Sequence, residues 1–270
     1  MKSVNSRKIE LFDAHCHLQD KRIISDSDRI INGWQRHGGT FLSCCGTCEE
    51  DWQAVADLSD QYPCILPSFG IHPWSAGTAG DNWSATLENF LDSRLSGIGE
   101  IGLDLIIKGN FDLQKTIFKT QISMAKEKKR PVSIHMRKAW DPFIHILKHI
   151  GPLPAGGLIH AYSGSADMIP LFETYGFYIS FSGPVTRKNN KKIRKALHTT
   201  SLDRILIETD APDMMFSLPD TLDQKTNKPE NLVYIASAAA ETLNLSFEKL
   251  ARITVSNGKK LFHQVINRKN

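Results

Sequence analysis

The chain has 270 residues, of which 41% are hydrophobic and 23% are charged, and its formal net charge is +4. These values are ordinary for a soluble globular protein, and the length suits one large α/β domain. No apolar run approaches about 18 residues, which excludes a membrane-spanning helix. Residues 1–10 are polar and lack the apolar region of a secretory signal. The mildly basic charge permits an anionic substrate without requiring one.

The chain contains five cysteines. An odd number in a chain of this size argues against a disulfide framework. Cys45 and Cys48 have the spacing of a redox or zinc motif, but no second pair follows at the spacing of a zinc ribbon. We therefore interpret the cysteines as reduced thiols and expect the protein in the cytoplasm, where thiols stay reduced.

Short apolar runs alternate with longer amphipathic stretches along the chain. The runs are rich in Ile, Leu, Val and Phe, and their starts lie roughly 20–35 residues apart, which is the size of a βα unit. We predict eight buried strands, at residues 11–15, 40–44, 65–71, 97–102, 131–135, 157–161, 177–181 and 204–207. The intervening stretches predict helices, the clearest of them at residues 112–129, 141–150, 230–243 and 247–262.

Strict alternation of strands and helices predicts a parallel sheet, either open or closed into a barrel. Polar residues of the types that bind metals stand at the C-terminal ends of six predicted strands: His15 with His17, His72, Glu100, His135, His160 and Asp210. In a barrel these strand ends converge on one mouth, whereas in an open sheet they would be too far apart to meet. The sequence therefore predicts a (β/α)8 TIM barrel with its active site at the C-terminal face of the strands.

The most specific local signal is the sequence His15-Cys16-His17. Residues i and i+2 of a strand point to the same face, so both imidazoles can reach one ion. Asp13 shares that face and could orient a ligand through a hydrogen bond. A lone His-x-His is weak evidence for a metal site. It gains weight here because other potential ligands end other strands.

The remaining candidate ligands stand on four later strands. Glu100 lies within an apolar, glycine-rich strand, where a carboxylate is costly to bury unless it is paired or bound to metal. His135 and His160 end adjacent strands, and Asp210 follows the last predicted strand. Glu208, two residues before Asp210, could buttress the site or form a structural ion pair.

Four histidines and two carboxylates exceed the needs of one four-coordinate ion and predict a site for two divalent cations. Glu100 is the natural bridging ligand, because it lies mid-way in strand order between the two pairs of histidines. The mixed nitrogen and oxygen ligands suit Zn²⁺, Mn²⁺, Co²⁺ or Fe²⁺, while Mg²⁺ prefers oxygen. Paired ions would acidify a water molecule between them, and Asp210 could accept its proton and deliver it to the leaving group.

In these motifs the chain resembles the TatD-type deoxyribonuclease family, a branch of the amidohydrolase-like barrels. The similarity runs almost end to end and includes the stretches at residues 12–17, 70–73, 99–104, 131–137, 160–164 and 208–212, with Asn257 and residues 261–262.

The resemblance implies a deformed TIM barrel, and we treat residues 1–270 as one domain. It implies that His15, His17, Glu100 and Asp210 hold a first cation. It further implies that Glu100, His135 and His160 hold a second one, as Zn, Mn or Mg. The activity that it implies is hydrolysis of phosphodiester bonds in DNA, typically as a Mg²⁺-dependent 3′→5′ exonuclease.

One segment departs from the family pattern. Many members carry a His-Arg-containing loop after the residue that corresponds to Asp210, and that loop could meet phosphate. Here the segment at residues 211–219 begins Ala-Pro-Asp213, and Asp213 is acidic. The departure weakens the implied nucleic-acid substrate and leaves the metal ligands intact.

Three further residues are candidates for substrate binding. His72 could touch a substrate phosphate, support a metal ligand or be structural. Arg137 could bind a phosphate oxygen, and Tyr162 could stack on a base or simply pack at the rim. The basic run at residues 187–195 follows the seventh predicted strand and could attract a polyanion or be a solvated helix face, whereas the cluster at residues 126–130 is expected on the opposite face.

We therefore predict a metal-dependent hydrolase, first as a nuclease that binds single-stranded DNA or another phosphate-containing substrate, with no obligate protein partner. The alternative is a hydrolase of the same architecture that acts on a small phosphoester, an amide or an aminoacyl ester. A binding protein with a decayed site is a third class, which the complete set of ligand types disfavours. Fold resemblance alone does not settle the substrate, because barrels of this kind host many chemistries.

Overall fold

The computed structural model describes residues 9–216 and 226–267. Within these ranges, eight parallel strands form one sheet in the order β1 to β8. The strands are β1 (Leu11–Cys16), β2 (Gly39–Cys45), β3 (Ile65–Phe69), β4 (Gly97–Asp104), β5 (Val132–Arg137), β6 (Gly157–Ile159), β7 (Phe177–Phe181) and β8 (Ile205–Ile207).

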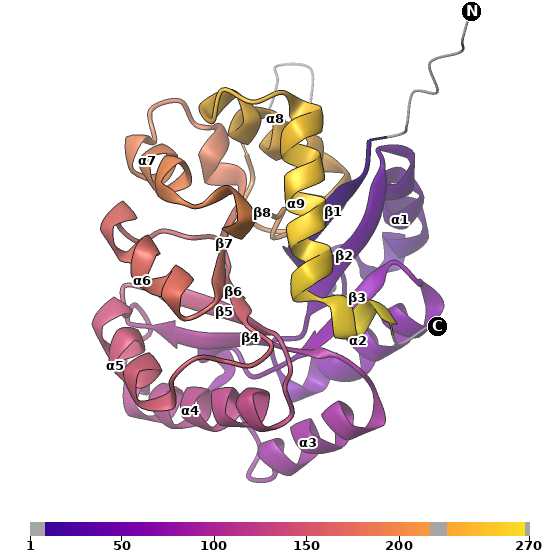
Figure 1. The fold of residues 1–270 in the computed structure, drawn as a ribbon. Helices are drawn as coiled ribbons and strands as arrows, with labels where there is room; N and C mark the ends of the chain where they lie inside the picture. Colours follow the sequence, from indigo (N-terminus) through magenta and orange to yellow (C-terminus); the bar gives the residue numbers. More distant parts are fainter. Residues whose placement is uncertain (1–8, 217–225, 268–270) are drawn as a thin grey trace, which may run out of the picture.

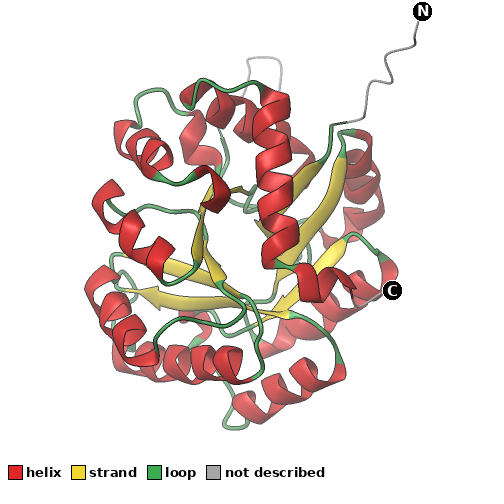
Figure 2. Cartoon of the chain, viewed as in Figure 1, coloured by secondary structure: helices red, strands yellow, loops and turns green. Residues whose placement is uncertain are grey.

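Helices connect successive strands and form an outer layer around them (Figure 1; Figure 2). The α-helices are α1 (Ser27–Arg36), α2 (Glu49–Gln61), α3 (Trp83–Ser93), α4 (Phe111–Glu127), α5 (Trp140–Ile150), α6 (Ile169–Thr174), α7 (Lys191–Thr199), α8 (Leu232–Thr242), α9 (Phe247–Leu261) and α10 (His263–Ile266). Short 3-10 turns include η2 (Pro73–Ser75) and η4 (Gly183–Thr186). In the part of the chain described, no helix is long and apolar enough to cross a membrane.

The strands form because their apolar residues are buried between the barrel interior and the helices, as is typical of parallel sheets. Every residue of β1, β3, β4 and β7 is buried. Backbone hydrogen bonds bring β1 together with the segment that follows β8. The amide of Asp210 donates to the carbonyl of His15 over 2.9 Å, and that of His17 donates to Ala211 over 2.7 Å. The sheet therefore curves round into a barrel.

The N-terminal end of the barrel is covered by α9 and α10. Figure 1 shows α9 crossing in front of the strands. Phe262 stacks on Phe12 with ring centroids 5.9 Å apart, and a Cβ on Gly258 would lie 2.6 Å from the Phe12 ring. The side chain of Asn257 donates to the carbonyls of Leu202 and Ile205, at the start of β8. These contacts close the N-terminal end of the barrel interior, so the barrel interior opens toward the C-terminal ends of the strands.

The barrel prediction is confirmed, and all eight expected strands are present within about two residues of the expected bounds at each end. Differences of two residues occur at four C-terminal ends: β3 ends at Phe69 and β6 at Ile159, earlier than expected, while β4 continues to Asp104 and β5 to Arg137. The expectation that the N-terminus carries no secretory signal falls mostly on residues 1–8, outside the described residues. The end of the divergent segment, residues 217–219, also lies outside them.

Candidate metal centre

Side chains from six strand ends meet at the C-terminal mouth of the barrel, and Glu100 lies at their centre. Glu100 is 2% exposed. Its Oε2 atom lies 3.3 Å from Nε2 of His15 and 3.1 Å from Nε2 of His17. Its Oε1 atom lies 2.8 Å from Nε2 of His160 and 2.9 Å from Nδ1 of His135. The two oxygens of one carboxylate thus face two different pairs of imidazoles.

Glycines in β4 allow the backbone around Glu100 to approach β5. A Cβ on Gly99 would lie 2.8 Å from Cβ of Ser133. Gly102 has a φ of 155°, and a Cβ there would collide with the carbonyl oxygen of His135. A side chain at either position would push the two strands apart. The glycine-rich sequence is therefore what places Glu100 against His135.

Asp210 completes the side of the site next to β1. Its Oδ1 atom lies 3.6 Å from Nε2 of His15 and 3.4 Å from Nε2 of His17. Asp210 is 7% exposed and Glu100 is 2% exposed, so Asp210 is the more open of the two carboxylates toward the mouth. The ligand atoms of His15, His17 and Asp210 all lie within 4.8 Å of one another, the spacing of a cation site.

Hydrogen bonds on the outer ring nitrogens orient three of the histidines. Nδ1 of His17 donates to the carbonyl of Cys45 over 2.8 Å, and Nδ1 of His160 faces the Glu208 carboxylate at 3.2 Å. Nδ1 of His15 lies 2.7 Å from Oγ of Ser133. A proton on Nδ1 leaves the Nε2 lone pair free to point at Glu100. This is how metal-binding histidines are usually held.

His72 differs from the other histidines of the centre. Its Nδ1 atom accepts a hydrogen bond from the backbone N–H of Trp74 over 3.1 Å, so the neutral ring carries its proton on Nε2. That nitrogen lies 3.3 Å from Oε1 of Glu100. Burial lowers the pKa of His72 to about 4, which keeps the ring neutral. His72 therefore presents a proton to Glu100 rather than a lone pair to a cation.

The ionisation of the remaining groups follows from their mutual contacts. Burial of the ring acts to lower the pKa of His160, but the negative charge of Glu100 outweighs this effect and raises the pKa to about 10. Burial acts to raise the pKa of Glu100, yet the surrounding imidazoles, of which His160 has the largest effect, hold this pKa well below the usual range. Without a cation the histidines therefore take up protons, and a bound cation must displace them.

The donor set fits divalent cations. Oε1 of Glu100 and Nε2 of His135 are buried and make no hydrogen bond of good geometry among the described residues, although imidazole nitrogens lie 2.8–2.9 Å from Oε1. Buried polar atoms in native proteins are almost always satisfied, so such atoms in a converging cluster are suited to ligate a cation. Imidazole nitrogens mixed with carboxylate oxygens suit Zn²⁺ or Mn²⁺.

Comparison with known proteins agrees with this geometry. The family model described as TatD related DNase matches residues 12–263. The chain belongs to the TatD-related DNase family. It is a metal-dependent hydrolase, and the resemblance seen in the sequence is confirmed.

Relatives cover nearly the whole chain. The metal-dependent hydrolase YabD of Bacillus subtilis is 34% identical over 254 residues, which are 93% of this chain and 98% of YabD. The deoxyribonuclease TATDN3 of Homo sapiens is 29% identical over 271 residues, which are 94% of this chain and 95% of TATDN3. The crystal structure of YJJV, a TatD homologue from Escherichia coli, has a TM-score of 0.88 at 26% identity and covers 94% of this chain, with 98% of YJJV matched.

At the rim of this TatD-family site, Arg137 and Tyr162 are placed differently from each other. The Arg137 side chain is 53% exposed, and Nη1 lies 4.0 Å from Oδ2 of Asp104. Tyr162 is 2% exposed, packs on Trp140, and donates its hydroxyl hydrogen to the carbonyl of Ser165. Because the ring is enclosed, the structure favours packing, the second of the two roles expected for Tyr162, over stacking on a base.

The structure adds supporting groups that the sequence interpretation did not include or left open. Ser133 contacts His15, and it could have been recognised because it lies two residues before His135 on the same strand. Glu208, which could have been either a buttress or a structural ion pair, contacts His160 and accepts from the backbone N–H of Ala161 over 2.6 Å. Trp74 contacts His72, and no sequence pattern pointed to it.

Charged residues surround the mouth on two sides. On the β7 side, Lys192 of the basic run donates to the carbonyl of Ser163 over 2.6 Å, so the run lies beside the loop that follows His160. On the β8 side, Asp213 binds both terminal nitrogens of Arg22, at 2.8 Å each. Asp20 binds Arg22 as well, with its Oδ1 2.9 Å from Nε and its Oδ2 2.8 Å from Nη2. Asp213, which departs from the family pattern, therefore pairs with the guanidinium of Arg22, which would otherwise be available to an anion.

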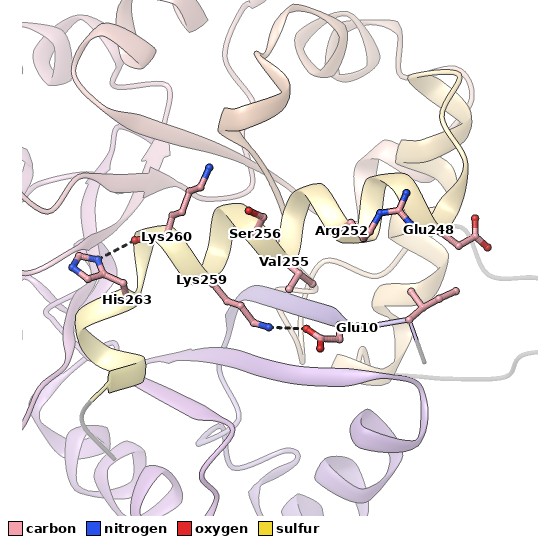
Figure 3. Close-up of a pocket in the computed structure, with 9 residues that line it drawn as sticks. Glu10, Glu248, Arg252, Val255, Ser256, Lys259, Lys260 and His263 are labelled. Atoms are coloured by element: carbon pink, nitrogen blue, oxygen red, sulfur yellow. Dashed lines mark hydrogen bonds and ion pairs between the residues drawn. The ribbon is translucent and has the colours of Figure 1, made fainter. Parts of the chain in front are cut away.

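A groove of about 1020 Å³ lies elsewhere, along the outer face of α9 (Figure 3). Its lining includes Arg252, Lys259, Lys260 and Glu10, and Lys259 pairs with Glu10 over 2.6 Å. These residues lie at the N-terminal end of the barrel, and none of them is a candidate ligand. The groove therefore contains none of the candidate metal ligands, which lie at the opposite end of the barrel.

Proposed function

We propose that the protein is a deoxyribonuclease that cleaves phosphodiester bonds with two divalent cations, as a 3′→5′ exonuclease on single-stranded DNA. One observation carries the two-cation part of the proposal. The Oε2 atom of Glu100 faces His15 and His17 at 3.1–3.3 Å, and its Oε1 atom faces His135 and His160 at 2.8–2.9 Å. A carboxylate placed between two sets of donors is suited to bridge two ions.

The chain supplies two sets of ligands. His15, His17 and Asp210 with one oxygen of Glu100 would hold the first cation, and His135 and His160 with the other oxygen would hold the second. When bound, the cations supply positive charge that makes a water molecule nucleophilic near neutral pH and neutralises the phosphoryl oxygens.

The protein's own groups carry the proton transfers and the orientation. Asp210, at the open side of the cluster, is placed to accept a proton from the attacking water and to return it to the leaving oxygen. The Nε2 proton of His72 faces Glu100 at 3.3 Å and supports its negative charge. The exposed guanidinium of Arg137 is available for the phosphate that flanks the scissile bond.

Two features support DNA as the substrate. The relative TATDN3 bears the name deoxyribonuclease, and the matching family model carries the same description. The basic residues Arg187, Lys188, Lys191 and Lys192 are exposed beside the mouth, where a polyanion would arrive. A small phosphoester is the second candidate, because the acidic cluster of Asp20 and Asp213 would repel a long polyanion on the β8 side.

Cleavage of end-labelled single-stranded DNA in Mg²⁺, Mn²⁺, Zn²⁺ or EDTA tests the proposal, with Asp210→Asn as the control. We expect metal-dependent stepwise shortening from the 3′ end that the substitution abolishes. Shortening from the 5′ end, or internal cleavage, would contradict the exonuclease assignment alone. No cleavage by folded, metal-loaded protein would reject DNA and favour the small phosphoester.

A further inference from the structure

An exposed indole lies at the edge of the metal centre and has no part in the mechanism above. Trp74 is 61% exposed, which is the largest value among the exposed large hydrophobic side chains of the described residues. By contrast, Trp34 and Trp52 are completely buried. A large apolar side chain left in water beside a catalytic site commonly marks a ligand-binding surface.

The ring of Trp74 is held in place by the protein. Its Nε1–H donates to Oδ2 of Asp104 over 2.9 Å, and its backbone N–H donates to Nδ1 of His72 over 3.1 Å. The ring meets the His72 ring edge-on, with centroids 5.1 Å apart and an interplanar angle of 89°. The residue also lies in the short turn η2, which begins with a proline. The indole is thus oriented before any ligand arrives.

This indole lies one side chain away from the proposed bridging carboxylate. The ring centroids of Trp74 and His135 are 6.4 Å apart, and Nδ1 of His135 lies 2.9 Å from Glu100. The same Asp104 oxygen that accepts from Trp74 lies 4.0 Å from Nη1 of Arg137. The buried carboxylate of Asp104 therefore lies beside both the exposed indole of Trp74 and the exposed guanidinium of Arg137, next to the metal centre.

The loop that follows β4, which leaves from Asp104, carries exposed apolar side chains. Leu105 and Ile106 are 44% and 41% exposed. The backbone N–H of Ile106 donates to Oδ1 of Asp104 over 2.8 Å, so this loop is tied to the same carboxylate as the indole. A planar, weakly polar ring would contact an aromatic face and aliphatic side chains here. The guanidinium of Arg137 would lie close to a phosphate attached to that ring.

We propose that Trp74 is the stacking platform of a nucleobase subsite, which binds the base adjacent to the scissile phosphate while Arg137 pairs with the neighbouring phosphate. The assignment rests on the proposed function, since it presumes a nucleotide substrate. Stacking on an indole accepts every base, because each base has a π face, so the subsite confers affinity without sequence preference.

Binding of a short, end-labelled oligothymidylate to the Asp210→Asn protein in Mn²⁺ tests the subsite without turnover, with the affinity taken from the anisotropy of the label and the stacking from tryptophan fluorescence. We expect the oligonucleotide to quench the fluorescence, and Trp74→Phe to remove most of the quenching while retaining most of the affinity. Trp74→Ala should weaken binding about fivefold to a hundredfold, the range measured for one base–aromatic stack. Leu202→Ala removes an exposed apolar side chain at the opposite end of the barrel and should change neither quantity.

A second substrate makes the test specific to the base. An oligonucleotide with abasic sugars at its 3′ end should bind the Trp74 protein as weakly as the intact oligonucleotide binds Trp74→Ala. Equal affinity of Trp74 and Trp74→Ala proteins for the intact oligonucleotide would overturn the subsite.

The two proposals can fail separately. Quenching of Trp74 by DNA in a protein that cleaves none would support the subsite and reject the nuclease. Cleavage by wild-type protein with an unchanged KM in Trp74→Ala would retain the nuclease and reject the subsite.

Discussion

The carboxylate of Glu208 lies directly against the outer nitrogen of His160, with Oε1 3.2 Å from Nδ1. Because this contact fixes a proton on Nδ1, it leaves Nε2 free to face Glu100. The same oxygen accepts from the backbone N–H of Ala161, so one buried residue orients both the ring and the chain that carries it.

Removal of this support should weaken the second cation site. We expect Glu208→Ala to reduce metal affinity about 10- to 100-fold, the usual effect of losing such a partner. Glu208→Gln retains an acceptor oxygen and should lose less. Competition with a chelator measures the affinity, and circular dichroism checks the fold. Equal affinity in all three proteins would show that Glu208 is only a structural acceptor for Ala161.

Much of this centre could be predicted from the sequence, because strand ends in a parallel barrel converge. His15, Glu100 and His135 lie within strands, where side chains alternate between faces, and His17 directly follows β1. The direction of each is then fixed by its position in the strand.

Tyr162 and the proton on His72, both beyond strand ends, could not be placed in this way. β6 ends at Ile159, and Ala161 has a φ of 40°, in the left-handed region. The alternation therefore stops before Tyr162, whose ring is buried instead of facing the mouth. The proton position on His72 depends on a hydrogen bond from Trp74 in a short turn, and no sequence period encodes it.

Glu100 should be essential for both cations. We expect Glu100→Ala to bind neither ion and to lose nearly all activity. The barrel should still fold, because the imidazoles can release the protons that Glu100 stabilises. Metal content per chain after dialysis, together with far-ultraviolet circular dichroism, measures both effects. A variant that retained two ions per chain would contradict the bridging role.

Metal binding should depend on pH through the histidines. The pKa of His160 is about 10 in the metal-free protein, above its usual value. A raised histidine pKa stabilises the folded metal-free protein fully below about pH 6.5, and this contribution is lost as pH rises toward the folded value. A cation must also displace this proton, which is harder at low pH.

The increase in Tm produced by Zn²⁺ should therefore grow between about pH 6 and about pH 9. Thermal unfolding with Zn²⁺ and with EDTA across this range measures the increase. A constant increment would mean that His160 holds no proton when the metal is absent.

The basic run beside the mouth should contribute to nucleic-acid binding. Arg187 and Lys191 are both exposed. We expect Arg187→Glu with Lys191→Glu to weaken binding of single-stranded DNA and to reduce its salt slope by about 1.4, or about 0.7 for each lost phosphate contact. Arg252→Glu with Lys260→Glu makes the same charge change at the far end of the barrel. If both double variants behave alike, only the net charge matters and the run is ordinary surface.

The pair formed by Arg22 and Asp213 should limit the affinity for anionic substrates. Their side chains are 47% and 57% exposed, so this ion pair contributes at most about 1 kcal/mol to stability. Asp213→Asn should therefore lower Tm only slightly. It removes one negative charge from the rim and frees a guanidinium nitrogen, so we expect tighter binding of both oligonucleotides and small phosphoesters.

The pattern of that gain separates the two candidate substrates. A larger gain for oligonucleotides than for a phosphomonoester would mean that a long chain passes Arg22, as a nuclease requires. A gain confined to the small ligand would place DNA elsewhere and favour the small phosphoester. Arg22→Ala is the matched control, because it removes the group that Asp213→Asn releases, and in the double variant it should abolish the part of the gain that the freed guanidinium provides. A gain that persisted there would show that the charge of Asp213, and not the freed arginine, controls affinity.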